Sequence, residues 1–292
     1  MKTTINEEDI KDVTFGVEME FSTPYEDIEP RFKNHFVGGS WHNEDRHHHH
    51  MADKCYGASH GHSWDLKLDG STETEFATPI LMLAHREDMH KFENLVKDVF
   101  ARRVETTDKD SVHVRVYCPW FTNNLVLETV WVYLERKICA CFPSHRYKKT
   151  GPKYPYNERY LTTAHKSPVW YLNRRNHNKA QGKRDEHNMI ISFKDFIYDK
   201  RLDENERLVE FRLSEGTSSW EHVYNYAKLC LYFCKACSLM SAEEVLNMVN
   251  SEPEHIHKLD KDSWLEIYDT LKLNDEPFKK WLKKRYAKYW KD

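Results

Sequence analysis

The sequence predicts an α+β protein, in which an antiparallel sheet is built from strands that helices separate along the chain, with further helices at the C-terminal end. Three short stretches alternate apolar and polar residues with a period of two, which is typical of strands that bury one face. Longer stretches repeat apolar residues at helical spacing. With 292 residues, of which 39% are hydrophobic, the chain can bury a substantial core.

The predicted strands cover residues 13–21, 112–116 and 208–213, and a turn at 69–71 leads into a fourth extended stretch that ends at Phe76. On each of them, charged or imidazole side chains occupy the face opposite the apolar residues. These polar faces carry Glu18, Glu20, Glu73, Glu75, His113, Arg115, Glu210 and Arg212.

Apolar stripes with spacings of three and four residues predict helices over residues 84–103, 124–140 and 219–239. Ser241 and Glu244 form a capping box that starts another helix. A basic amphipathic helix is expected over residues 278–290.

Composition and charge argue against several classes of protein. The net charge of −3 does not favour binding to nucleic acid, and no apolar run approaches the roughly 20 residues that span a bilayer. The first residues lack the apolar core of a signal peptide, so a cytoplasmic location is expected. Seven cysteines, an odd number, are expected to be reduced thiols.

If the strands pair in one antiparallel sheet, their polar faces bring together five carboxylates and the imidazole of His113. Buried like charges are costly unless cations neutralise them. Carboxylate oxygens with one imidazole suit Mg²⁺ or Mn²⁺ better than zinc. The alternative is that each Glu simply faces solvent, and that Glu210 and Arg212 form an ordinary surface ion pair.

Five short motifs in a fixed order give a more specific indication. They are Phe-Gly-Val-Glu-Met-Glu-Phe (15–21), Asp-Gly-Ser (69–71), Glu-Phe-Ala-Thr-Pro (75–79), His-Val-Arg-Val (113–116) and Val-Glu-Phe-Arg (209–212), with Gly-Thr (216–217) following. This pattern resembles the amidoligases, which are relatives of glutamine synthetase and glutamate–cysteine ligase. The resemblance covers about residues 14 to 225.

The resemblance implies a glutamine synthetase-like catalytic fold, a curved antiparallel sheet with helices on its convex face and the active site on its concave face. On this reading, residues 1–240 form the catalytic domain, with long loops at 24–63 and 145–187. Residues 241–292 form a helical extension packed on it. The first loop contains a run of four histidines at 47–50, and the second is rich in Lys and Arg.

By position, the resemblance implies five metal ligands, which are Glu18, Glu20, Glu75, His113 and Glu210. It gives Arg212 the role of handling phosphate or a substrate carboxylate. Arg146, Arg115 and Ser71 are expected to contact the cofactor, although Arg115 departs from the pattern because the family has a second histidine there. Glu73 or Asp69 is a candidate base that takes the proton of the amine.

The expected function is an ATP- and Mg²⁺-dependent (or Mn²⁺-dependent) ligase that forms an amide from a carboxylate and an amine through an acyl phosphate. The carboxylate substrate is a small molecule or a peptide, and no membrane partner is expected. Three alternatives remain open: a phosphotransferase, a metal-dependent nuclease on the same acidic site, and a non-catalytic binding module.

Overall fold

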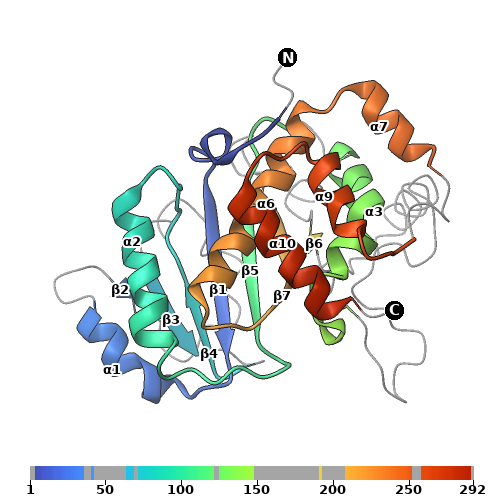
Figure 1. Cartoon of the computed structure of the whole chain (residues 1–292). Helices are drawn as coiled ribbons and strands as arrows, with labels where there is room; N and C mark the ends of the chain where they lie inside the picture. The colour runs from blue at the N-terminus through green and yellow to red at the C-terminus, as the bar shows by residue number, and fades with distance from the viewer. Residues whose placement is uncertain are drawn as a thin grey trace, which may run out of the picture. The chain divides into compact units, whose positions relative to one another are not determined.

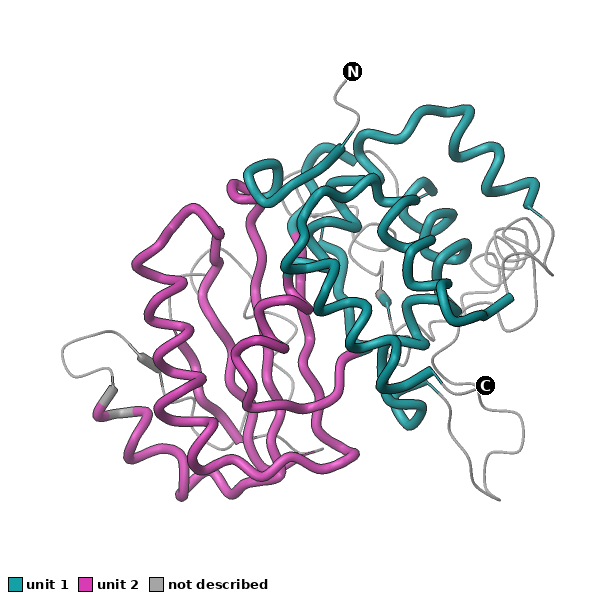
Figure 2. Tube along the Cα trace, in the orientation of Figure 1, with its two compact units in different colours: residues 1–10, 117–213, 228–292 teal, residues 11–116, 214–227 magenta. Residues whose placement is uncertain are grey.

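The computed structural model describes most of the 292 residues, in eight stretches. These are residues 4–35, 41–42, 64–68, 72–121, 125–147, 191–192, 208–251 and 258–290. The chain divides into two compact units, shown in Figure 2. Unit 1 comprises residues 1–10, 117–213 and 228–292, and unit 2 comprises residues 11–116 and 214–227.

Unit 2 is built on five neighbouring strands, in the order β2-β3-β4-β1-β5. Strand β1 (Phe15–Phe21) pairs antiparallel with β4 (Thr74–Ala77) on one side and with β5 (Ser111–Tyr117) on the other. Strand β3 (Trp64–Leu68) pairs antiparallel with β4 and parallel with the two-residue β2 (Trp41–His42). The predicted α+β class is therefore confirmed. The curvature of the sheet and its glutamine synthetase-like fold stay predictions.

Helices cover one face of this sheet (Figure 1). They are α1 (Tyr25–His35), α2 (Arg86–Asn94) and a π-helical continuation of α2, η2 (Leu95–Phe100). Phe76 of β4 lies at the centre of the aromatic core, because its ring is 5.0 Å from Phe100 and 6.1 Å from Phe92, measured between centroids. Phe21 packs 4.8 Å from Phe100. These large apolar side chains account for the side of the sheet on which the helices pack.

Part of the segment predicted as the 24–63 loop is helical. In α1, Tyr25, Ile28 and Phe32 recur at spacings of three and four residues and are buried. The structure thus contradicts the loop prediction for residues 25–35. The four histidines at 47–50 lie outside the described residues, as do residues 148–187 of the second predicted loop.

Unit 1 contains the helices α3 (Leu125–Cys139), α7 (Ala242–Val249), α9 (Ser263–Thr270) and α10 (Glu276–Tyr289). It also holds the short helices η1 (Glu7–Asp9) and η3 (Ser144–Arg146) and the strand β6 (Ile191–Ser192). Strand β7 (Leu208–Glu215) and helix α6 (Trp220–Leu239) each contribute residues to both units. The predicted helices in α3, α6, α7 and α10 are confirmed, including the capping box at Ser241.

A buried lysine links three segments of unit 1. Lys228 of α6 is 2% exposed, and its ammonium contacts the carboxylates of Glu7 and Asp275. Tyr232 donates a hydrogen bond of 2.7 Å to Asp275, whose other oxygen caps α10 by accepting from the Phe278 amide at 3.0 Å. Because buried charges need partners, this cluster fixes η1, α6 and the start of α10 together. The division predicted at residue 240 is not tested by these contacts and stays a prediction.

The six cysteines that the structure describes are buried: Cys118, Cys139, Cys141, Cys230, Cys234 and Cys237. Burial raises the pKa of the Cys234 and Cys237 thiols well above the ordinary value, which keeps them protonated. In the described part of the chain, no helix combines the length and the apolar character needed to cross a bilayer.

Gly216, from the Gly-Thr motif, lies against a buried aspartate within unit 2. Its amide donates a 2.8 Å hydrogen bond to the carbonyl oxygen of Asp110, and Asp110 accepts further hydrogen bonds from Ser22 and from the Thr107 amide, each at 2.6 Å. A methyl group added at Gly216 would lie 2.3 Å from Cβ of Asp110 and 2.9 Å from its backbone carbon. Glycine is required here by this close approach.

We therefore expect Gly216→Ala to lower the free energy of unfolding by about 2 kcal/mol or more, because neither the backbone nor the bonded Asp110 side chain can yield cheaply. Chemical denaturation measures this change. Ser218→Ala, two residues further on, is the matched control and should change it by less than about 0.5 kcal/mol. Equal effects of the two substitutions would contradict the packing role of Gly216.

Candidate metal-binding site

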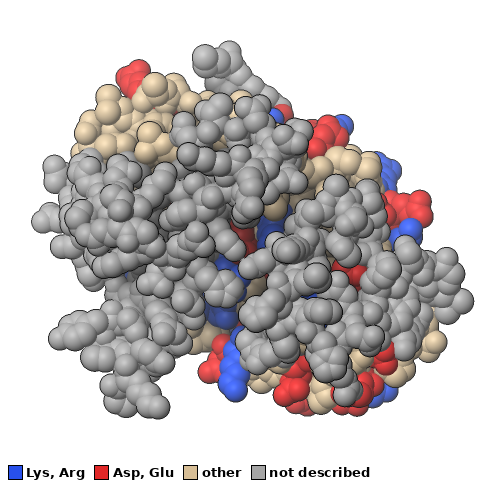
Figure 3. Space-filling view, turned by 180° about the vertical axis from the view of Figure 1, so that it is seen from behind, with Lys and Arg blue, Asp and Glu red and all other residues tan. Residues whose placement is uncertain are grey.

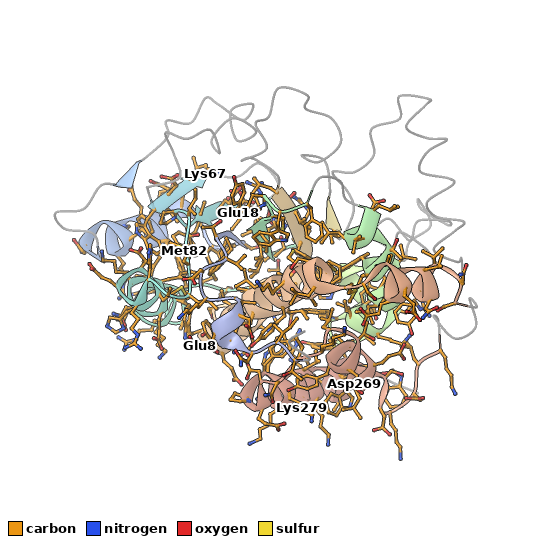
Figure 4. The ribbon with its side chains drawn as sticks, turned by 90° about the horizontal axis from the view of Figure 1, so that it is seen from above. Glu8, Glu18, Lys67, Met82, Asp269 and Lys279 are labelled. Carbon is orange, nitrogen blue, oxygen red and sulfur yellow. The ribbon has the colours of Figure 1, made fainter. Side chains whose placement is uncertain are left out.

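The sheet of unit 2 has an acidic face opposite its helices. Along β1, Val17, Met19 and Phe21 are buried in the core, so Glu18 and Glu20 between them point to the other side. Figure 4 shows Glu18 and Lys67 together on the side of the strands away from α2. Viewed from behind Figure 1, acidic and basic side chains adjoin one another at the surface (Figure 3).

The strand register arranges these side chains in two rows. In one row, Glu20 of β1 lies opposite Glu75 of β4, which in turn lies opposite Lys67 of β3. In the other row, Glu18 of β1 lies opposite His113 of β5. Directly opposed residues on neighbouring strands have their side chains in reach of each other. The structure thus brings four of the five predicted metal ligands onto one face, since Glu18, Glu20, Glu75 and His113 all belong to unit 2.

Both carboxylate oxygens of Glu18 have a partner. Nη1 of Arg115 lies 2.9 Å from Oε1, and Nδ1 of His113 lies 3.4 Å from Oε2. The Glu18 side chain is only 8% exposed. Burial by itself raises the pKa of this carboxyl, but the charge of Arg115 and the contact with His113 outweigh it and hold the pKa well below its usual range. Glu18 is therefore ionised and paired with Arg115.

Glu20 is held by a hydroxyl group. Ser111, which precedes His113 by two residues on β5, donates a short hydrogen bond to Oε2 of Glu20, and its oxygen also lies 2.8 Å from Nε2 of His113. The same imidazole nitrogen is 3.9 Å from Oε2 of Glu20. His113 thus lies between the two carboxylates of β1, with one ring nitrogen toward each.

Glu75 is in an unfavourable position for a negative charge. Lys67 contacts its Oε1 at 2.9 Å, but burial and the neighbouring charge of Glu18 prevail over the lysine. Together they raise the pKa of Glu75 to about 7. A cation placed beside Glu75 would relieve this penalty.

These donors fit a hard divalent cation. Oxygen ligands from Glu20 and Glu75, which lie directly opposite each other, with a single imidazole nearby, match the preference of Mg²⁺ and Mn²⁺. Within the described residues, Ser111 and His113 contact Glu20 at Oε2, and Lys67 contacts Glu75 at Oε1. An ion would be met by the second oxygen of each carboxylate, Oε1 of Glu20 and Oε2 of Glu75.

A second group of predicted residues meets within unit 1. Nη1 of Arg212 donates to Oε1 of Glu210 at 3.0 Å, and Nη2 of Arg146 donates to the backbone carbonyl of Arg212 at 2.9 Å. Arg146 and Arg212 are separated by 66 residues in the sequence. The participation of Glu210 in the same metal site as Glu18 and His113 stays a prediction.

Of the three remaining predicted site residues, the structure describes one. Glu73 is described, and it is exposed at a bend just before β4, where its amide donates to the carbonyl of Phe21 at 3.0 Å. Asp69 and Ser71 lie outside the described residues. The roles of all three stay predictions.

Sequence reasoning missed Lys67, Asp65 and Ser111. The first two belong to β3, where Trp64 and Leu66 are buried and Asp65 and Lys67 share the acidic face. The alternating sequence Trp-Asp-Leu-Lys-Leu (64–68) is the signal that predicts this strand, and hence its two charged residues. Ser111 lies one step in the same alternation before His113.

No protein-family model matches the chain, and a comparison with curated proteins finds no match. Among solved structures, the chain is similar to a bifunctional glutathione synthetase from Pasteurella multocida, with 12% identity and a TM-score of 0.44. The match covers 97% of this chain and 48% of that one, so the chain spans about half the length of that structure.

The raised pKa of Glu75 predicts a pH dependence of stability in the metal-free protein. Between its ordinary value of 4.5 and about 7, folded Glu75 keeps a proton that the unfolded chain has released. The free energy of unfolding should therefore fall as pH rises through this window, by about 2 to 3 kcal/mol in total. Glu75→Gln should flatten the profile and be more stable than the wild type at pH 8.

Denaturation at a series of pH values in the presence of a chelator measures the effect. Glu73→Gln, an exposed glutamate two residues away, is the control and should follow the wild type. The assignment is wrong if the Glu75→Gln and wild-type profiles keep the same slope between pH 5 and about 7.

Proposed function

We propose that the chain is a metal- and ATP-dependent ligase that joins a carboxylate to an amine, as its resemblance to the amidoligases implies. The observation that supports the proposal is the acidic face of unit 2, where Glu18, Glu20 and Glu75 lie on two adjacent strands with His113 on a third. A face that serves only to meet solvent has no need to oppose two glutamates directly, since like charges in that position are destabilising.

Glu20 and Glu75 would hold a divalent ion, with Glu18, His113 and Glu210 completing the metal-binding set. An ion bound there supplies positive charge to the phosphates of ATP. The chain's own contribution is to fix the ligands on paired strands, where their positions change little. Arg212, whose Nη1 donates to Glu210 at 3.0 Å, would meet phosphate or carboxylate charge.

The reaction requires no nucleophile from the protein. An oxygen of the substrate carboxylate attacks the γ-phosphorus of ATP, and the bond to the β-phosphate oxygen breaks, giving an acyl phosphate and ADP. The amine then attacks the acyl carbon, inorganic phosphate leaves, and the amine gives up one proton. Positioning and charge stabilisation account for the catalysis. Glu73 and Asp69 are the candidates to accept the proton.

Substitution of the predicted ligands tests the metal site. Glu18→Gln and Glu210→Gln should each reduce metal-dependent ADP release by about 100-fold or more while the fold is kept, because a neutral amide replaces a charged ligand. The assay measures ADP over a panel of carboxylates and amines, with circular dichroism to monitor folding. Glu221→Gln, an exposed glutamate of α6, is the matched control. Near-normal turnover in both site variants would refute the proposal.

Product analysis separates the ligase from its rivals. The ligase releases ADP and phosphate only when both carboxylate and amine are present, and the amide appears in equal amount. A phosphotransferase would accumulate a stable phosphorylated product without the amine. A nuclease would cleave nucleic acid without ATP, and a binding module would bind ligand without turnover.

A further inference from the structure

Helix α10 of unit 1 has one buried apolar face and one exposed basic face. The buried face carries large apolar residues, which are Phe278, Trp281, Leu282 and Tyr286. The opposite face carries exposed lysines at helical spacing, which are Lys280, Lys283, Lys284 and Lys288. Three of them, Lys280, Lys284 and Lys288, recur every four residues and so follow one another at about 6 Å along the helix axis. We call these three the lysine row.

The positive charge of this face is not balanced on the helix. Glu276 is the one acid of α10, against six Lys or Arg residues, and it lies 3.5 Å from Lys279. Within the described part of the chain, none of the four exposed lysines forms an ion pair. Arg285 is buried and donates a 3.1 Å hydrogen bond to the carbonyl of Cys141. The exposed positive charge of the helix therefore comes from lysine.

Helix stability does not account for this arrangement. Like charges four residues apart repel each other on a helix surface, so the pairs Lys280–Lys284 and Lys284–Lys288 are each unfavourable. A cation is favourable near the C-terminus of a helix, but this effect is confined to the last turn, which contains only Lys288 of the row. The row thus has a cost to the helix that a negatively charged ligand would remove.

The packing of the buried face argues against a membrane as that ligand. A basic amphipathic helix binds a lipid surface by placing its apolar face below the headgroups. In α10 this face is occupied within unit 1. The ring centroid of Phe278 lies 5.3 Å from that of Tyr232, and the hydroxyl of Tyr286 donates a 2.7 Å hydrogen bond to the carbonyl of Asp260. The exposed face offers charge without an apolar anchor.

The composition of the exposed face favours a phosphate backbone over an acidic protein. Protein–protein interfaces are centred on apolar and aromatic residues and are depleted in lysine. The other exposed residues of α10 are Glu276, Pro277 and Ala287, which supply no such centre. Nucleic acids present phosphates at regular intervals, and lysines neutralise them as point charges. Contacts of this kind position a nucleic acid without reading its bases.

We propose that the lysine row of α10, with Lys283 beside it, binds the phosphate backbone of nucleic acid without sequence preference. The net charge of −3 does not predict this binding, because nearly all of the acids that set it lie outside this helix. The proposal does not depend on the proposed ligase function, since it assigns a separate binding surface to unit 1.

Fluorescence anisotropy of a short labelled DNA of mixed sequence, single-stranded or duplex, measures the binding over a series of salt concentrations. The full chain should bind with a Kd of about 1 to 100 µM at physiological salt. Replacing the row by Lys280→Gln, Lys284→Gln and Lys288→Gln together should weaken binding at least about tenfold. The slope of log K against log salt should become shallower by about two to three units. DNA of another base sequence should bind equally well.

A matched triple variant removes the same number of charges elsewhere. Arg102→Gln, Arg103→Gln and Lys109→Gln together replace exposed cations of unit 2 and should leave the Kd and the salt slope unchanged. Thermal unfolding identifies any variant that fails to fold. The row variant should be at least as stable as the wild type, because it loses two repulsive pairs.

Two results would overturn the proposal: no binding of DNA by the wild type at low salt, or equal weakening by the two triple variants. Vesicles that contain phosphatidylserine and the polypeptide polyglutamate test the other anionic partners. The proposal also fails if either of them binds through the row more tightly than DNA does. No ATP, carboxylate or amine is present in these assays, so their outcome is independent of the ligase function.

Discussion

The organisation of unit 2 depends on one electrostatic constraint, which is the cost of placing carboxylates side by side on adjacent strands. Once the aromatic core commits one face of the sheet to the helices, the period-two alternation forces Glu18 and Glu20 to the other face. Each acid there is met by a different kind of group. Glu18 meets a guanidinium, Glu20 a hydroxyl and Glu75 an ammonium.

These partner groups differ in how well they stabilise the charge of the carboxylate that they contact. The difference makes Glu18 and Glu75 chemically distinct. Arg115 keeps Glu18 ionised, whereas Lys67 does not offset the burial and the neighbouring charge that act on Glu75. The face therefore holds one carboxylate, Glu18, whose charge is well neutralised and another, Glu75, whose charge an added cation would stabilise. A site with unequal carboxylates can distinguish positions for ions, which a uniform acidic patch does not.

The face on which each acidic side chain lies could be predicted from the sequence. The strand register, helix α1 and the side-chain contacts could not, for physical reasons. The alternation in β1 and β5 is clear, so the faces of Glu18, Glu20 and His113 were predicted correctly. The alternation of apolar and polar residues does not predict the pairing register of neighbouring strands. This register places Glu75 between Glu20 and Lys67. Helix α1 was missed because only three of its residues are buried apolar ones and Pro30, a residue that disfavours helices, lies inside it. The choice of Glu18 as the partner of Arg115 depends on side-chain contacts, which a linear pattern does not contain.

The buried Lys228 in unit 1 has a consequence for how the chain tolerates change. Glu7 and Asp275 are distant in the sequence, yet both carboxylates neutralise the same ammonium. Removing the segment that carries either acid would leave a charge in the interior with half its compensation. Deleting the segment that carries Glu7 is therefore expected to destabilise the packing at the start of α10. Deleting the segment that carries Asp275 is expected to destabilise the packing of η1, because both acids contact the same ammonium group of Lys228.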